Sequence, residues 1–166
     1  MRSTTYYIFI GCLFASYFIT AQTSLQQLLD QHTKNSIPFI SVEEVAQKTD
    51  HFILLDAREE KEFEISHLKN AIHVGYDHFI IDTITKKKFS KDSPIVVYCS
   101  LGIRSERIAE KLKKQGYKNI FNLYGGIFEW KNKNFPVVNK HEQETDSIHV
   151  FSKEWGKWLL KGKKTH

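Results

Sequence analysis

The chain has 166 residues, of which 41% are hydrophobic, and this supplies enough apolar material for one folded domain with extensions. Its formal net charge of +5 is modest and indicates solubility rather than a polyanionic partner. The sequence shows no recognisable nucleic-acid-binding motif, repeat or low-complexity tract, so we expect no nucleic-acid partner.

The first segment is typical of an export signal. Arg2 precedes an uncharged, mostly apolar stretch from Tyr6 to Ala21 that ends in small residues before Gln22. We predict that residues 1–21 are a signal peptide and that the protein is periplasmic or secreted. One alternative is an uncleaved membrane anchor, since roughly sixteen apolar residues fall short of the ~20 that cross a bilayer. Lipid attachment at Cys12 is a third.

Cleavage after Ala21 has a chemical consequence. It removes Cys12 and leaves Cys99 as the only thiol of the mature chain. No internal disulfide can then form. A lone cysteine in an oxidising compartment is unusual unless it is reactive, which favours a catalytic role for Cys99.

After an N-terminal extension at residues 22–37, the chain alternates short apolar strands with helical stretches. The pattern predicts strands at 39–40, 52–55, 95–98 and 120–123, and helices at 41–48, 59–66 and 105–115, with Gly116 capping the last helix. This alternation predicts an α/β fold with a parallel sheet covered on both faces. Ligands of such folds bind outside the carboxyl ends of the strands.

The strand at 95–98 ends on Cys99, and a short loop leads from there into a helix. Successive backbone N–H groups can turn inward in such a loop, Gly102 supplies backbone freedom, and Arg104 adds a permanent positive charge. These features stabilise a thiolate, so Cys99 is a candidate nucleophile. The alternative is that Cys99 is a small buried hydrophobe that closes a strand.

The length of this loop discriminates between chemistries. Arg104 follows Cys99 in the spacing Cys-x-x-Gly-x-Arg, whereas cysteine phosphatases have one more residue between Cys and Arg. A tighter loop suits the single outer sulfur of a persulfide better than a tetrahedral phosphate. The spacing therefore favours sulfur transfer over phosphatase or arsenate reductase chemistry.

Four motifs in order resemble the single-domain rhodanese (thiosulfate sulfurtransferase) family over roughly Pro38 to Val138. They are the strand ending in Asp-x-Arg at 54–58, the segment from Glu62 to His73, the cysteine loop, and the Gly-Gly-x-x-x-Trp and Pro-Val elements at 125–137. The resemblance implies a three-layer fold with a mostly parallel five-stranded central sheet and helices on both faces, here with an added C-terminal amphipathic helix. Ser66, Asn70 and Asn134 stand where the family usually has glycines, which puts local turn geometry in question.

The residues and the resemblance together predict the chemistry. The Cys99 thiolate attacks the outer sulfur of thiosulfate or a similar sulfur-containing anion, and the persulfide passes its sulfur to cyanide, a small thiol or a protein thiol. The sulfur-binding loop consists of Ser100, Leu101, Gly102, Ile103, Arg104 and Ser105. The alternative is a persulfide carrier or redox-sensing module without turnover.

Asp56 and Arg58 end a strand near the expected site and are candidates for a supporting role, although a buried structural ion pair explains them equally well. His67 occupies the family's histidine position, where we expect a structural hydrogen bond. The histidines lack metal-ligand spacing with other ligand residues, so we predict neither a metal nor a cofactor.

Residues 139–166 form the predicted linker and basic C-terminal helix. Phe151, Trp155, Trp158 and Leu159 recur at helical spacing with lysines between them, which predicts an amphipathic helix. Packing of its apolar side on the domain is one explanation. Peripheral contact with a membrane or a partner, through this helix or the N-terminal segment, is the other. We expect a monomer.

Overall fold

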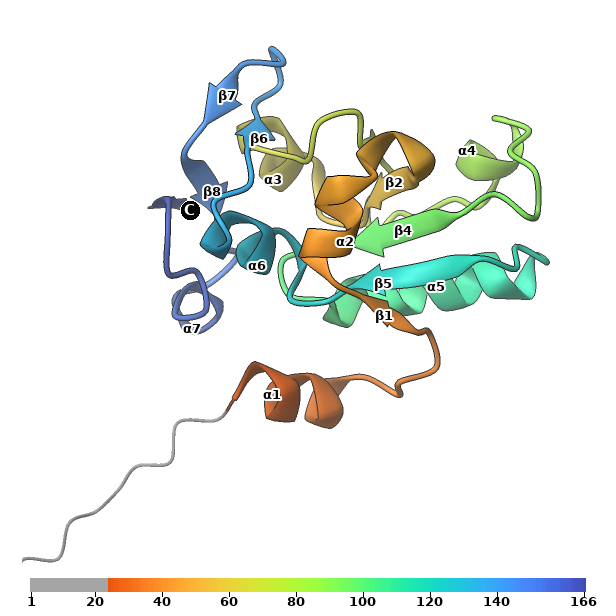
Figure 1. The fold of residues 1–166 in the computed structure, drawn as a ribbon, viewed down its shortest axis with the longest axis horizontal. Coiled ribbons are helices and arrows are strands. Elements are labelled where there is room, and N and C mark those ends of the chain that lie inside the picture. The colour runs from red at the N-terminus through yellow and green to blue at the C-terminus, as the bar shows by residue number, and fades with distance from the viewer. Residues whose placement is uncertain (1–23) are drawn as a thin grey trace, which may run out of the picture.

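The computed structural model describes residues 24–166, so the predicted signal peptide and Cys12 lie outside the described residues. Five parallel strands form the central sheet in the order β1-β5-β4-β2-β3, which confirms the predicted α/β class (Figure 1). Its strands are β1 (Phe39–Ile40), β2 (Ile53–Asp56), β3 (Ile72–His73), β4 (Ile95–Tyr98) and β5 (Ile120–Leu123).

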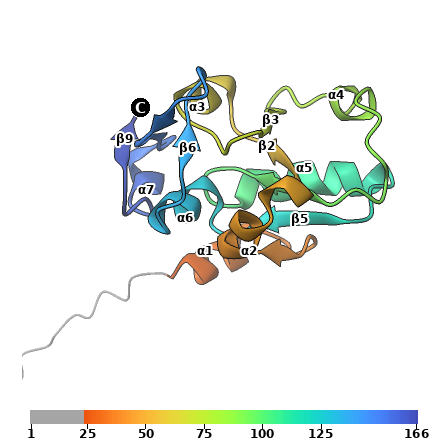
Figure 2. The ribbon, with the colours of Figure 1, turned by 45° about the horizontal axis from the view of Figure 1, so that its top comes forward.

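Helices pack on both faces of this sheet. They are α1 (Leu25–His32), α2 (Val42–Gln47), the single 3-10 turn η1 (Thr49–His51), α3 (Glu60–Ile65), α4 (Asp82–Thr85), α5 (Ile103–Lys114) and α6 (Gly126–Asn132). Figure 1 shows α2 in front of the strands, α5 behind them and α6 to the left, next to the ends of β4 and β5, and Figure 2 shows α5 running along the sheet.

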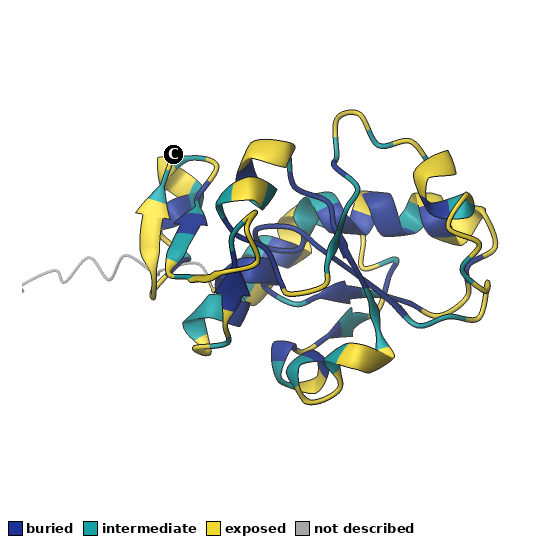
Figure 3. Cartoon of the chain, turned by 90° about the horizontal axis from the view of Figure 1, so that it is seen from above, coloured by how far each residue is buried: buried dark blue, intermediate teal, exposed yellow. Residues whose placement is uncertain are grey.

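The side chains of β4 divide the core into two halves. Val96 and Tyr98 belong to the cluster that also contains residues of α2 and α6, whereas Ile95 and Val97 belong to the cluster that contains residues of α5. This alternation follows from the period of two along a strand, and a strand buried on both faces is therefore apolar throughout. Figure 3 shows the central strands as the most deeply buried part of the chain.

Helix ends follow ordinary capping chemistry. Ser41 accepts a hydrogen bond from the backbone N–H of Glu44 at the start of α2. Gly116, one residue beyond the C-cap of α5, has a φ of +88°, as the sequence predicts. The predicted helix and strand positions between 39 and 123 agree with the structure to within about two residues at each end, the usual scatter of helix boundaries.

Two of the three departures from the family's glycines keep a glycine-like backbone. Asn70 and Asn134 have φ values of +64° and +63°, a left-handed conformation that asparagine tolerates better than most residues. Ser66 is extended, with a φ of −166°, and needs no glycine. The turns therefore keep their geometry despite the substitutions.

The predicted C-terminal amphipathic helix is wrong. The segment instead holds β6 (Val137–Val138) paired with β7 (Glu144–Thr145), and β8 (Ser147–His149) paired in parallel with β9 (Lys163–Thr165), with the short helix α7 (Lys153–Gly156) between the last two. The segment between the parallel strands β8 and β9 brings the chain back alongside β8, and only Lys153–Gly156 of it is α-helical.

The tail nevertheless packs on the domain. Leu159 is buried, and Trp155 and Trp158 are partly buried against the first core cluster. A single helical turn followed by an irregular segment thus buries, at least in part, the apolar residues that suggested a continuous helix. Among residues 24–166, no helix is both long and apolar enough to span a bilayer.

Candidate active site

Cys99 lies at the carboxyl end of β4, where the loop into α5 begins. The backbone N–H of Gly102 donates to its Sγ at 3.1 Å, and the Ser105 hydroxyl lies 3.5 Å from the same atom. Gly102 has a φ of +116°, a conformation that favours glycine and turns the loop back toward the sulfur. The loop predicted from the sequence is therefore a cradle around Sγ.

The surroundings of Cys99 favour its thiolate. Burial opposes ionisation, but the charge of Arg104 and the hydrogen bonds from Ser105 and Gly102 outweigh it and hold the pKa of Cys99 below its usual value. Its side chain is 2% exposed, so the reactive atom is reached only through the pocket above it.

Arg104 is not a free cation. Its Nη1 and Nη2 donate to the two carboxylate oxygens of Glu62 at 2.7 and 2.8 Å, and Nη2 also donates to the Ser100 hydroxyl at 3.1 Å. Glu62 is buried on α3, and this guanidinium lowers its pKa against the opposing effect of burial. The pair fixes the orientation of Arg104 while cancelling much of its net charge.

The Gly125-Gly126 motif supports the cradle from behind. The start of α6 faces the loop: Ile127 N donates to the carbonyl of Cys99 at 2.9 Å, and Phe128 N donates to that of Ser100 at 3.2 Å. Because these carbonyls point back toward α6, the loop N–H groups are free to face the sulfur. A Cβ on Gly126 would overlap the Cys99 carbonyl oxygen, which explains the glycine.

Asn122 of β5 is a buried polar residue that the sequence reasoning missed. Its Nδ2 donates to the Gly102 carbonyl at 2.7 Å, and its Oδ1 accepts from the Ser105 hydroxyl at 2.7 Å. The Ser105 hydroxyl has one proton and two acceptors within reach, Asn122 Oδ1 at 2.7 Å and Cys99 Sγ at 3.5 Å. A polar residue within an apolar strand was the available signal.

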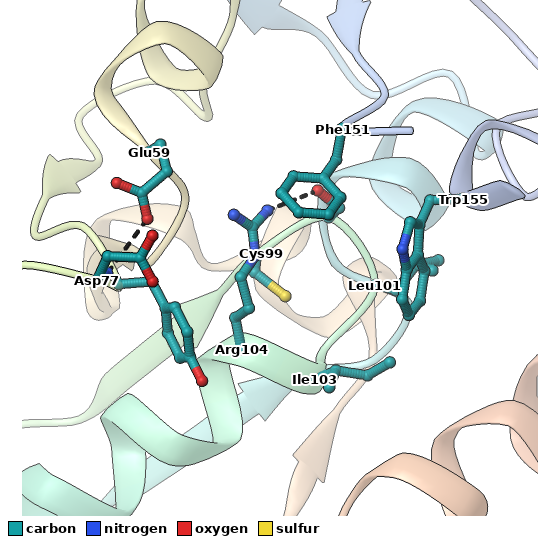
Figure 4. A pocket seen from close by; sticks show the side chains of 10 residues that line it. Glu59, Asp77, Cys99, Leu101, Ile103, Arg104, Phe151 and Trp155 are labelled. Carbon is teal, nitrogen blue, oxygen red and sulfur yellow. Dashed lines mark hydrogen bonds between the residues drawn. The ribbon is translucent and has the colours of Figure 1, made fainter. Parts of the chain in front are cut away.

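A cavity of about 240 Å³ lies over Cys99. Figure 4 shows Glu59 and Asp77 on one side of Arg104, and Phe151, Leu101 and Trp155 on the other. The lining residues are Glu59, Tyr76, Asp77, Cys99, Ser100, Leu101, Ile103, Arg104, Phe151 and Trp155. The structure thus brings the predicted loop residues to one pocket, except Gly102 and Ser105, which contact the sulfur from below.

Asp56 and Arg58 do not line this pocket. Both are fully buried, and Arg58 Nη2 contacts Asp56 Oδ2 at 2.6 Å and the Ser66 carbonyl at 2.5 Å. Their geometry is that of a structural pair that ties the end of β2 to the turn after α3. His67 is also structural: its Nδ1 lies 2.9 Å from the Phe63 carbonyl.

Within residues 24–166, no group of three or more His, Cys, Asp or Glu side chains is arranged to hold a metal ion. Besides Asn122, sequence reasoning missed Glu59, Tyr76, Asp77 and the aromatic pair Phe151 and Trp155 as pocket residues. Motif matching cannot find the aromatic pair, because it comes from the tail beyond the matched motifs.

Comparison with known proteins identifies relatives over the same region. The chain is 33% identical over 88 residues to the thiosulfate sulfurtransferase GlpE of Coxiella burnetii (strain RSA 331 / Henzerling II), covering 53% of this chain and 78% of that protein. It is also 32% identical over 112 residues to the tRNA uridine(34) hydroxylase of Onion yellows phytoplasma (strain OY-M), covering 64% of this chain but only 36% of that protein.

A solved structure shows the same fold. The rhodanese-related protein from Thermoplasma volcanium superposes with a TM-score of 0.52 and 27% identity, covering 61% of this chain and 97% of that one. The model of the rhodanese-like domain family matches residues 41–133, which include β2, the Cys99 loop and the Gly125-Gly126 motif. The chain therefore belongs to the rhodanese-like domain family.

Proposed function

We propose that this protein is a sulfurtransferase that carries sulfane sulfur as a persulfide on Cys99. The observation that carries the proposal is the cradle itself: a sulfur that accepts an N–H from Gly102, contacts Ser105 and lies beside a fixed guanidinium. Such donors stabilise the thiolate before the reaction and the terminal persulfide sulfur after it.

The reaction has two displacements. The Cys99 thiolate attacks the outer sulfur of thiosulfate or a related donor, the new S–S bond forms, and the donor's S–S bond breaks with its electron pair leaving on sulfite or its equivalent. An external nucleophile, which is cyanide, a small thiol or a protein thiol, then removes the terminal sulfur and restores the thiolate. Covalent storage of sulfur predicts ping-pong kinetics.

Oxyanion chemistry of the phosphatase or arsenate reductase kind has less support. The loop is short, and the guanidinium of Arg104 is bound in both of its outer positions by Glu62. A tetrahedral dianion needs donors that are not already engaged.

The test is the intact mass of the purified protein before and after treatment with thiosulfate or a polysulfide, with Cys99→Ser in parallel. We expect the wild type to gain one sulfur atom and the variant none, and cyanide to remove the sulfur as thiocyanate. Repeated release of sulfite with cyanide present distinguishes an enzyme from a carrier that loads once. Absence of any sulfur adduct from either donor would contradict the proposal.

A further inference from the structure

Glu59 and Asp77 form one side of the pocket, and the wall opposite them comes from the C-terminal tail. Phe151 follows β8 and Trp155 belongs to α7, and both lie beyond the 41–133 range of the family match. Phe151 remains 55% exposed although it lies over the Arg104 guanidinium, whose carbon is 4.9 Å from the ring centroid. A large aromatic side chain left open at a pocket mouth is available to a ligand.

Other apolar side chains complete this surface. Leu101 and Ile103 of the cysteine loop lie on the side of Trp155 (Figure 4). Tyr76 also lines the pocket. The Tyr76 hydroxyl accepts from Arg107 Nη1 at 2.6 Å, which holds that ring in place. Cavities of about 150 Å³ with apolar walls bind benzene, so the volume of about 240 Å³ here accommodates a six-membered ring.

The charges around the pocket disfavour a dianion. Of the residues described as lining it, Arg104 is the only cation, and Glu62 offsets much of its charge through two hydrogen bonds. Glu59 and Asp77 add two carboxylates at the rim, where Asp77 N donates to Glu59 Oε1 at 3.2 Å. A small, strongly hydrated dianion loses its water in this pocket without gaining an unpaired cation.

We infer that the pocket selects organic thiosulfonates, in which an apolar, ring-sized group replaces one charged oxygen of thiosulfate, as sulfur donors to Cys99. This inference rests on the proposed sulfurtransferase function. The thiolate attacks the outer sulfur of R–SO₂–S⁻, the Cys99 S–S bond forms, and the bond between the two donor sulfurs breaks with its electron pair leaving on the sulfinate R–SO₂⁻. The R group lies against Phe151 and Trp155.

The experiment compares two monoanionic donors that differ only in that group. The kcat/KM for sulfur transfer from benzenethiosulfonate and from methanethiosulfonate to cyanide is measured, and each value is divided by the rate constant of the same donor with free glutathione thiolate. This division removes intrinsic reactivity. We expect the corrected ratio to favour benzenethiosulfonate about tenfold or more, equivalent to about 1.4 kcal/mol.

Three variants locate the effect. Phe151→Ala should lower the corrected ratio at least about threefold, because it removes the ring that contacts the phenyl group. Leu160→Ala is the matched control, since Leu160 is an equally apolar side chain of the same tail, 78% exposed and outside the pocket, and should leave the ratio unchanged. Asp77→Asn should raise the efficiency of thiosulfate relative to methanethiosulfonate.

The outcomes separate this inference from the proposed function. A corrected ratio near one, or a preference that Phe151→Ala leaves intact, would overturn the inference while persulfide formation from methanethiosulfonate still supported sulfur transfer. If no donor loads Cys99, both fail.

Discussion

Gly126 offers a direct test of how the cradle is built. It has a φ of +54°, and a Cβ added there would overlap the Cys99 carbonyl oxygen and lie 2.7 Å from the Ser100 carbonyl carbon. Ordinary contact begins at 3.4 Å, so relieving the Ser100 contact alone moves the loop and α6 apart by about 0.7 Å, and the closer Cys99 carbonyl oxygen requires a larger displacement. Displacements of this size move the N–H donors away from Sγ.

The cost has two parts. The left-handed backbone costs alanine about 1–2 kcal/mol, and weakening the two hydrogen bonds from α6 to the loop costs about 1 kcal/mol each. For Gly126→Ala we expect the free energy of unfolding to fall by about 3 kcal/mol and Tm to fall by roughly 6–12 °C, as measured by calorimetry. Persulfide formation should fall about 100-fold, since a misplacement near 1 Å costs that much.

Gly116→Ala is the matched control. Gly116 has a φ of +88° but nothing within 4 Å of the added Cβ, so this substitution carries the backbone cost alone. It should lower Tm by roughly 2–8 °C and leave the rate of persulfide formation unchanged. The reasoning fails if Gly126→Ala reacts within threefold of the wild type, or if Gly116→Ala slows the reaction equally.

Three further predictions concern the site and the predicted signal peptide. The rate of persulfide formation should fall as pH falls through the pKa of Cys99, which Arg104 and the hydrogen bonds at Sγ hold below that of a free cysteine. Ser105→Ala should move the midpoint of the pH profile upward, and an unchanged stopped-flow pH profile would count against the cradle. Glu62→Gln should lower the free energy of unfolding by about 3 kcal/mol, because it leaves Arg104 without a carboxylate. Thermal melts should show this as a fall in Tm of roughly 6–12 °C, and an unshifted melt would refute the prediction. Protein recovered from the exported fraction should begin at Gln22 by intact mass, whereas a full-length chain in the membrane fraction would favour an anchor.

The sequence pattern predicted four of the five strands of the sheet and the cysteine loop because both depend on local pattern, whereas β3 was not among the predicted strands. The strands of the sheet are short and apolar, and the run from Ile95 to Tyr98 is buried on both faces, so its composition alone identifies it. The loop follows from residue types that have few alternatives: a cysteine at a strand end, a glycine and an arginine at fixed spacing. Family resemblance added the order of the motifs and the double glycine.

What the sequence did not predict depends on contacts between distant segments. Glu62 precedes Arg104 by 42 positions, and only the packing of α3 against the loop shows that they form an ion pair. The prediction for the tail was wrong for the same reason. The helical spacing of Trp155 and Leu159 cannot reveal that β9 pairs with β8 or that α7 is a single turn.

Because β8 pairs with β9, the aromatic wall of the pocket and the cysteine loop are held by different parts of the chain. Phe151 is placed by Val150, whose N–H donates to the Thr165 carbonyl at 3.0 Å, so the aromatic wall depends on a strand that shares no residue with the cysteine loop. Sequence changes or proteolytic trimming near Thr165 would therefore alter which donors are accepted without touching the atoms that carry out sulfur transfer.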